Sequence, residues 1–416
     1  MGLTFESCTA DQNNGVVSST DPVVEQESSA PTVLKSRTNN PKEADDVVNM
    51  AKVRAAIPPH CWEISTVKGL TYLVQDIVLI GLLYALRVYL LSDFMSGAYG
   101  SLVSVFTRLV WWNLMGFQLW CLFMIGHDAG HGTFSTSPAI NMIVGHVAHV
   151  PLLVPYHGWR QSHRIHHMYH NDLDRDKTWT PVKESTAKGW KDDNTWYGSI
   201  RFTALSLLMF PYYLLVAEAG DLVYGSHFNP FNEVLFKTTH DRICATVGTA
   251  SIAAFLMSVF SFSVAHTPTV LAGFFAFVDW YFIPYIIFSM WLSLVTNLHH
   301  THPESLFYRN AQWSFVKGAA TTVDRDFGPI INYFMHHIET HVLHHLFFTK
   351  IAHYNLVEAT EYAKPALGHH YKKDVRNPIL AFMSDMDYCK TVKDEGDVLH
   401  FNEYESYKAK YMPKEE

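Results

Sequence analysis

Residues 159–179 read WRQSHRIHHMYHNDLDRDKTW, and their histidine pattern decides how the rest of the chain is interpreted. At their centre lie His163, His166 and His167, at spacing i, i+3, i+4. On a helix, side chains at this spacing leave one face within a turn of each other. Because neutral imidazole is a good ligand for first-row metals, the pattern predicts a helical metal-binding segment.

Two further clusters repeat the pattern elsewhere in the chain. His341, His344 and His345 have the same spacing in HVLHH, and His127 and His131 stand four residues apart in HDAGH. A lone histidine pair is more often an ordinary core or surface feature, but three such boxes together predict a metal site. The boxes supply eight histidines, whereas a tetrahedral zinc takes about four ligands, so we expect two ions.

Iron is the expected metal, because zinc has no redox chemistry and redox work on an inert substrate needs a metal that can react with dioxygen. His300, in LHHTH at the end of an apolar run, is a ninth candidate ligand. Four neighbours of the boxes are expected to orient the imidazole rings or to pack beside them rather than to bind metal: Asp128, His170, His336 and Glu339.

The composition favours a membrane protein and argues against nucleic acid as a partner. Hydrophobic residues make up 48% of the 416 residues and charged residues 17%, while the mean hydropathy is only +0.01. Long polar segments must therefore offset the apolar ones. The net charge of -8 offers no basic surface to nucleic acid. The five cysteines are scattered without CxxC pairs, so they predict neither a disulfide framework nor a zinc knuckle.

Four apolar runs are long enough to cross a bilayer, for which about 20 residues suffice. They cover residues 70–91, 101–126, 245–264 and 270–297. Two shorter runs, 141–154 and 203–217, suit interfacial or re-entrant helices better than spans. We therefore expect an all-α, multi-pass membrane protein with four transmembrane helices and a cytosolic helical cap that holds the histidines.

The polar segments set the limits and the orientation of this domain. Residues 1–48 show no apolar periodicity and are expected to form a disordered tail, which leaves 49–416 as one membrane domain. The loops 92–100 and 266–269 contain no lysine or arginine, whereas residues 127–244 contain ten. By the positive-inside rule, both termini and all three boxes face the cytosol.

The boxes HDAGH, HRIHH and HVLHH resemble those of the membrane fatty acid desaturases, whose pattern is HxxxH, HxxHH and HxxHH. The stretches VPYHGWRQSHRIHH, PYIIFSMWLSLVTNLHH and TTVDRDFG resemble the methyl-end desaturases of plant endoplasmic reticulum, the omega-3 and delta-12 enzymes. The likeness implies a diiron site, dioxygen as co-substrate and an acyl lipid substrate linked to phospholipid or CoA. It also implies cytochrome b5 and its reductase as electron donors at the endoplasmic reticulum membrane. The family's iron ligands correspond to His127, His131, His163, His166, His167, His341, His344 and His345, and His300 matches a further family histidine.

Smaller features bear on which bond is desaturated. Asp128 in HDAGH and the tail segment KDEGDVLHF resemble the omega-3 type, whereas HTHP after the fourth apolar run resembles the delta-12 type. The omega-3 assignment is therefore favoured, and a delta-12 enzyme that makes linoleate from oleate is the alternative. Ala129 and Ala352 stand where the family usually has cysteine and proline, and we expect both to shape the acyl channel.

Two other functions use parts of the same pattern. A hydroxylase or conjugase would share the whole scaffold, because its chemistry diverges only after the first hydrogen is removed. A histidine-rich metal transporter is the non-enzyme alternative. Transport sites lie near the middle of the spans, whereas these boxes lie in or beside cytosolic segments, so the enzyme is favoured.

Overall fold

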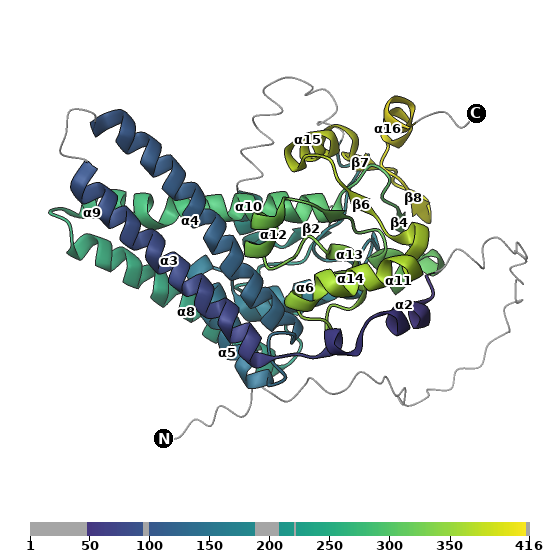
Figure 1. Cartoon of the computed structure of the whole chain (residues 1–416), viewed down its shortest axis with the longest axis horizontal. Coiled ribbons are helices and arrows are strands. Elements are labelled where there is room, and N and C mark those ends of the chain that lie inside the picture. Colours follow the sequence, from purple (N-terminus) through teal and green to yellow (C-terminus); the bar gives the residue numbers. More distant parts are fainter. Residues whose placement is uncertain (1–47, 95–99, 188–207, 220–221, 413–416) are drawn as a thin grey trace, which may run out of the picture.

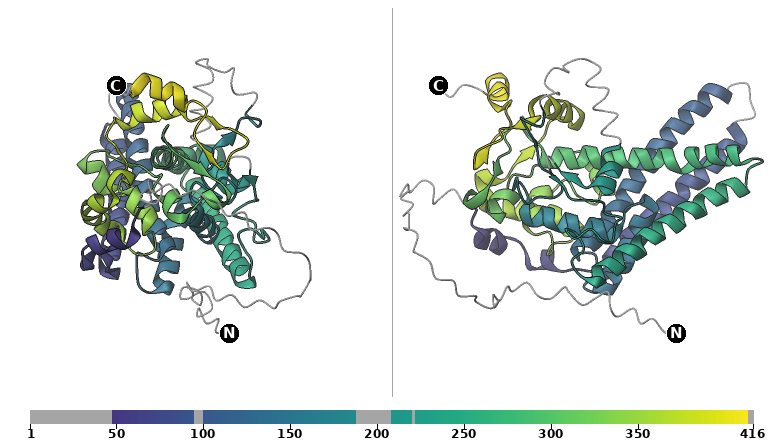
Figure 2. Two further views of the ribbon diagram at one scale, coloured as in Figure 1. Left: turned by 90° about the vertical axis from the view of Figure 1, so that its right-hand side faces the viewer. Right: turned by 180° about the vertical axis from the view of Figure 1, so that it is seen from behind.

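The computed structural model describes residues 48–94, 100–187, 208–219 and 222–412, so nearly all of the expected tail lies outside the described residues. Four long helical segments extend to the left in Figure 1, and a cap of short elements lies to the right. The view from behind in Figure 2 shows the same division. Helices make up most of the described chain, so the prediction of an all-α fold is confirmed.

The four predicted spans correspond to four helical segments that are long and apolar enough to cross a membrane. They are α3 (Thr66–Phe94), α4 (Gly100–His131), α8 (Thr239–Ala265) and a composite of α9 (Val270–Phe277), the π-helical turn η4 (Val278–Phe282) and α10 (Ile283–His300). The main difference from the prediction is at the end of α4. This helix continues beyond residue 126 to His131, so the first box forms its last turns.

The side chains of the spans divide between an inner and an outer surface. Trp111, Met115 and Phe288 are buried where α4 packs against α10. Val74 on α3 and Val247 on α8 are among many exposed apolar residues of the outer faces. An apolar outer surface of this kind suits the hydrocarbon of a bilayer, because lipid offers no hydrogen bonds and favours apolar contact.

A buried arginine in α3 has a protein environment that replaces water. Arg87 forms an ion pair with Asp279 and lies between two indole rings, 4.3 Å from the ring centre of Trp111 and 4.7 Å from that of Trp280. Ionisable groups inside a membrane are usually paired in this way, and cation–π contacts strengthen when water is absent. The charge therefore does not prevent α3 from being a span.

The cap is built from short helices and four pairs of two-residue strands. Its first part is α5 (Pro138–His149) with the 3-10 turn η3 (Val150–Leu152), followed across a bend of 103° by α6 (Tyr156–Tyr169). The bend fits the re-entrant or interfacial helix expected at 141–154. Of the second short apolar run, residues 208–216 are helical, and 203–207 lie outside the described residues.

The cap also contains further short helical elements. They are α2 (Met50–Ala56), η2 (Pro59–Trp62), η5 (Asn310–Gln312), α11 (Phe315–Ala319), α12 (Pro329–Phe334), α13 (His341–Leu346), α14 (His353–Leu367), η6 (Gly368–His370), α15 (Pro378–Tyr388) and α16 (Tyr404–Tyr411). The strand pairs are β1 (Val182–Lys183) with β7 (Thr391–Val392), β2 (Glu218–Ala219) with β3 (Leu222–Val223), β4 (Phe307–Tyr308) with β8 (Val398–Leu399), and β5 (Asp324–Arg325) with β6 (Lys373–Asp374). β1–β7 and β5–β6 are parallel, and the other two pairs are antiparallel.

Candidate metal centre

Four helices bring the histidine boxes together where the spans meet the cap. The ends of α4 and α10 supply the first box and His300, α6 supplies the second box and α13 supplies the third. The rings gather into two clusters that lie next to each other. All the box histidines are buried except His163, which is partly exposed. The neighbouring Arg164 is exposed and belongs to neither cluster.

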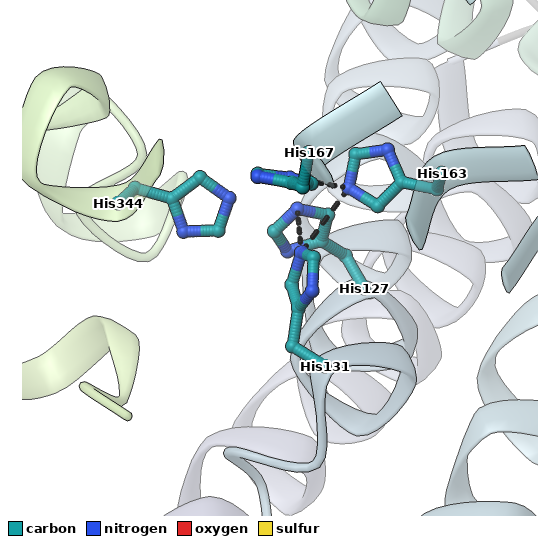
Figure 3. A group of neighbouring side chains, drawn as sticks. All are labelled: His127, His131, His163, His167 and His344. Atoms are coloured by element: carbon teal, nitrogen blue, oxygen red, sulfur yellow. Dashed lines mark hydrogen bonds between the residues drawn. The ribbon is translucent and has the colours of Figure 1, made fainter. Parts of the chain in front are cut away.

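The first cluster contains His127, His131, His163, His167 and His344, whose ligand atoms all lie within 4.8 Å of one another. Figure 3 shows the five rings pointing toward a common centre from three helices. Three successive Nε2–Nε2 distances, from His127 to His131, from His131 to His163 and from His163 to His167, are each 3.1 Å.

These distances fit a bound metal ion. Two imidazole nitrogens that bind one ion at about 2.1 Å and at a right angle are about 3.0 Å apart. The Nε2 of His344 is buried and has no hydrogen-bond partner among the described residues. A buried nitrogen without a partner is costly, and a metal bond would satisfy it. The donor set, which is entirely imidazole, therefore suits a first-row transition metal.

The second cluster is formed by two overlapping groups that share His345. One group contains His166 and His170, and the other contains His300 and His341. The Nε2 atoms of His300 and His341 are 2.9 Å apart. Both ring nitrogens of His345 are buried without a hydrogen-bond partner in the described part of the chain. This cluster therefore also offers free imidazole nitrogens to an ion.

Neighbouring histidines are divided between the clusters by a simple rule. On α6, His163 and His167 join the first cluster and His166 joins the second. On α13, His341 and His345 join the second cluster and His344 joins the first, so each i, i+4 pair shares one cluster. Residues at i+3 and i+4 differ by about 100° around a helix, so the two neighbours point to different centres.

Burial favours the neutral form of five box imidazoles. It lowers the pKa well below the usual value for His163, His167, His341, His344 and His345, and nearby histidines lower it further. A neutral imidazole has a free lone pair on one nitrogen, which is the form that binds metal. These five rings are therefore in their metal-binding protonation state at neutral pH.

Carboxylates lie close to two of the rings. The Nδ1 of His166 lies 2.9 Å from Oδ2 of Asp176, a fully buried residue, so this nitrogen carries the proton and Nε2 is left for the cluster. Asp128 lies 3.4 Å from Nδ1 of His127 and accepts a 2.8 Å hydrogen bond from Nδ1 of His353. Such partners usually set the tautomer and direction of a ligand ring.

Two of the four expected neighbours, His336 and Glu339, have hydrogen-bond partners outside the boxes. The Nε2 of His336 donates a 2.9 Å hydrogen bond to Asp76 of α3, and Glu339 lies 3.2 Å from His337. No hydrogen bond joins His336 or Glu339 to a box histidine among the described residues. His336 and His337 both have left-handed φ angles, of 54° and 58°, and the His336 ring bonds to α3.

Asp176 was one of several carboxylates near the boxes that could orient a ring but were expected to be solvated, and His353 carried no expectation. Asp176 lies nine residues after His167, in a loop whose charges look like ordinary solvated ones, and His353 stands alone outside any helical spacing. His170 was expected to be a neighbour, yet its ring lies within the second cluster. Only the tertiary structure reveals these positions.

A cavity of about 140 Å³ connects the two clusters to the spans. Histidines of both clusters line one side of it, including His127 and His300, and apolar residues such as Trp120, Phe210 and Leu292 line the other. Ala129 and Ala352, which were expected to shape the acyl channel, lie outside this cavity. Neither lines the cavity: Ala129 packs in a separate cluster with Leu73 and Phe134, and Ala352 precedes α14. 

Comparisons with known proteins agree with this architecture. The family model described as fatty acid desaturase matches residues 104–376. The endoplasmic reticulum acyl-lipid omega-3 desaturase (cytochrome b5) of Arabidopsis thaliana is 37% identical over 84% of this chain and 86% of its own length. The chloroplastic sn-2 acyl-lipid omega-3 desaturase (ferredoxin) of the same plant is 38% identical over 85% of this chain and 75% of its own. The sn-1 acyl-lipid omega-3 desaturase (ferredoxin) of a Nostoc species is 36% identical over 87% and 95%, respectively.

Proposed function

Since the chain belongs to the fatty acid desaturase family, we propose that it is an omega-3 desaturase, which places a cis double bond near the methyl end of an unsaturated acyl chain. Each turnover removes one hydrogen from each of two adjacent carbons. One dioxygen, two electrons and two protons are consumed with them, and both oxygen atoms leave as water. The likeness to relatives with omega-3 names over most of the chain favours this product over the delta-12 alternative.

The observation that carries the proposal is the pair of buried histidine clusters that open into one cavity with apolar walls. A site that only stored or carried metal would not need this apolar space beside it. An acyl chain gains about 0.8 kcal/mol for each methylene that it buries in an apolar space. The apolar side of the cavity, with Phe123 and Val295, can therefore hold the chain beside the clusters.

We assign one iron to each cluster. His127, His131, His163, His167 and His344 would hold the first, and His166, His300, His341 and His345 the second. With dioxygen and two electrons, such a centre supplies the oxidising power to remove hydrogens from an unactivated alkyl chain. The residues of this chain orient the rings, through Asp176 and Asp128, and exclude water from the cavity with aromatic side chains.

Cytochrome b5 is the proposed electron donor and the endoplasmic reticulum membrane the proposed location. The support is the similar plant enzyme whose name specifies both, although other relatives are named for ferredoxin. The lysines and arginines of the cap favour an orientation in which both termini and the clusters face the cytosol. A glycosylation acceptor inserted at Pro268 should then be modified, and one inserted at Lys350 should not.

Expression in yeast tests the activity directly. Cells fed linoleate should gain a triunsaturated acid with its new double bond three carbons from the methyl end. Conversion of oleate to linoleate without any triunsaturated product would reassign the chain to the delta-12 class, and a hydroxy acid would indicate a hydroxylase. The same assay in a strain without cytochrome b5 should show little product if the proposed donor is correct.

Metal analysis of the purified chain tests the site separately. We expect about two irons per chain, in line with the two clusters. One zinc and no iron would contradict the diiron assignment, whatever the lipid analysis shows.

A further inference from the structure

We propose that His170 is a positioning residue for the second iron: it holds His300 by a hydrogen bond and is itself held by the backbone carbonyl of Gly318. This inference rests on the proposed diiron function and extends it to a residue outside the histidine boxes. His170 follows α6 directly and is 1% exposed. It lies three residues after His167, where the spacing of the second box had already ended.

The hydrogen bonds fix where the protons are. The Nδ1 of His170 lies 2.8 Å from the carbonyl oxygen of Gly318, which can only accept, so Nδ1 carries the proton of a neutral ring. The Nε2 of His170 is then an acceptor. It lies 2.9 Å from Nδ1 of His300, so that nitrogen must be the donor. His170 thereby specifies the tautomer of His300.

The consequence appears on the other side of the His300 ring. With its proton on Nδ1, His300 has a free lone pair on Nε2, and this atom lies 2.9 Å from Nε2 of His341. His300 and His341 form one group with His345, whose two ring nitrogens have no hydrogen-bond partner among the described residues. The order Gly318, His170, His300 and metal is the arrangement in which a ligand histidine is oriented through its second nitrogen.

The support for His170 is built into the surrounding backbone. The hydroxyl of Thr321 also donates to the Gly318 carbonyl, at 2.6 Å, so the acceptor is held from two directions. The indole of Trp313 donates to the carbonyl of His170 at 3.0 Å. A Cβ atom at Gly318 would lie 2.1 Å from that same carbonyl oxygen, so only glycine permits this approach.

The turn after His170 is held in an uncommon conformation. Asn171 has a φ of 54°, in the left-handed region. Its side-chain amide donates to Thr321 at 2.7 Å and to the carbonyl of Leu306 at 2.9 Å. Conformations of this kind persist where the surroundings determine them from several sides. The position of the His170 ring is thus set by three separate segments of the chain.

Two variants at this position separate the roles of the two ring nitrogens. In His170→Gln the side-chain amide is long enough to accept from His300 while it donates to Gly318. In His170→Asn the amide is shorter and reaches only Gly318. If His170 acts by positioning His300, Gln should keep about two irons per chain and most of the activity. His170→Asn should lower the iron content at the second site. It should also lower the desaturation rate about 10–100-fold, the usual range for a partner of a ligand histidine.

A buried histidine with similar bonds provides the control. His227 is 0% exposed, its Nδ1 donates to the carbonyl of Leu214 at 3.2 Å, and its Nε2 lies 2.9 Å from the hydroxyl of Ser162. It has no bond to a cluster histidine that the structure describes. The variants His227→Gln and His227→Asn should have nearly the same iron content as each other. If loss of packing alone mattered, the pair of variants at His170 would behave in the same way.

The measurements are iron per purified full-length chain, the Mössbauer spectrum of the iron and the desaturation rate. Loss of iron in His170→Gln to the same extent as in His170→Asn would mean that His170 binds metal directly, and would overturn the positioning role. Full iron content with an unchanged spectrum in both variants would also overturn it. A wild-type chain without iron would instead refute the proposed diiron function itself.

Discussion

The two histidine clusters have the same donor chemistry but are supported differently. In the first cluster, His127, His131, His163 and His167 have their Nε2 atoms in a chain of 3.1 Å contacts. In the second, the rings depend on groups outside the boxes: His166 on Asp176, and His300 on His170. The first cluster thus consists mainly of regularly spaced rings of α4 and α6, with His344 of α13, whereas the second depends more on groups in the loops.

This difference predicts which changes should damage each cluster. Changes to the boxes themselves should damage both clusters, whereas changes in the loops should affect the second cluster more.

The largest effect should follow the loss of a box histidine. His163 lies 3.1 Å from both His131 and His167 through its Nε2, so His163→Ala removes the centre of the first cluster. We expect the desaturation rate to fall below detection. This loss is larger than the loss of about 100-fold that follows removal of a residue that only orients a ligand. Product analysis in yeast and iron per purified chain measure the two consequences. Normal iron with normal product would exclude His163 as a ligand.

A smaller loss should follow a change in the loop that supports the second cluster. Asp176→Asn keeps the shape of the side chain but removes the charge that holds Nδ1–H of His166, so we expect a loss of about 10–100-fold in activity. Asp174→Asn in the same loop is the matched control, because that side chain is 56% exposed and its partner Arg309 is 3.5 Å away. Equal rates for the two variants would show that Asp176 has no special role.

A third change should affect stability rather than chemistry. His336 and Asp76 form a fully buried pair, so His336→Leu leaves a buried carboxylate without this partner. Removing one member of such a pair typically costs about 3–5 kcal/mol. We expect a lower Tm of the purified chain with little change in iron per folded molecule. The double variant Asp76→Leu/His336→Leu should recover part of the loss in Tm. If the losses of the two single variants simply added in the double variant, the two residues would not be coupled.

The smallest effect should come from a third group of possible ligands, His60, Cys61 and Glu358. Here His60 and Glu358 have side chains that are 56% and 51% exposed, and their 3.0 Å contact is open to water. Exposed ion pairs contribute about 0–1 kcal/mol. His60→Ala should therefore leave iron content, activity and Tm nearly unchanged. A loss of iron in this variant would reveal a metal site that burial alone does not identify.

Sequence spacing was sufficient for much of the site because helices impose a regular geometry. The spacing of the boxes predicted helical segments that carry the histidines, and the structure has these segments in α4, α6 and α13. The four apolar runs predicted the spans, since a helix needs about 20 apolar residues to cross a bilayer. Both kinds of pattern are local, so both can be read along the chain.

The parts that spacing missed all depend on contacts between distant segments. Asp176 and His353 reach the clusters only because the cap folds over α4 and α6. His336 is the opposite case: it is near the third box in sequence, but its ring bonds to Asp76 of α3. A histidine or aspartate in a loop has no periodic signal, so its partner cannot be inferred from its neighbours.

By itself, the sequence determined the helical segments, the set of box histidines and the likeness to the desaturases, because these follow from local periodicity and composition. The tertiary structure decided how adjacent histidines divide between the clusters: His166 from His167, and His344 from His345. It also decided that His170 meets His300, across 130 residues of sequence. The physical reason is that a helix sets the angle between neighbouring side chains, whereas only packing between helices sets what lies in each direction.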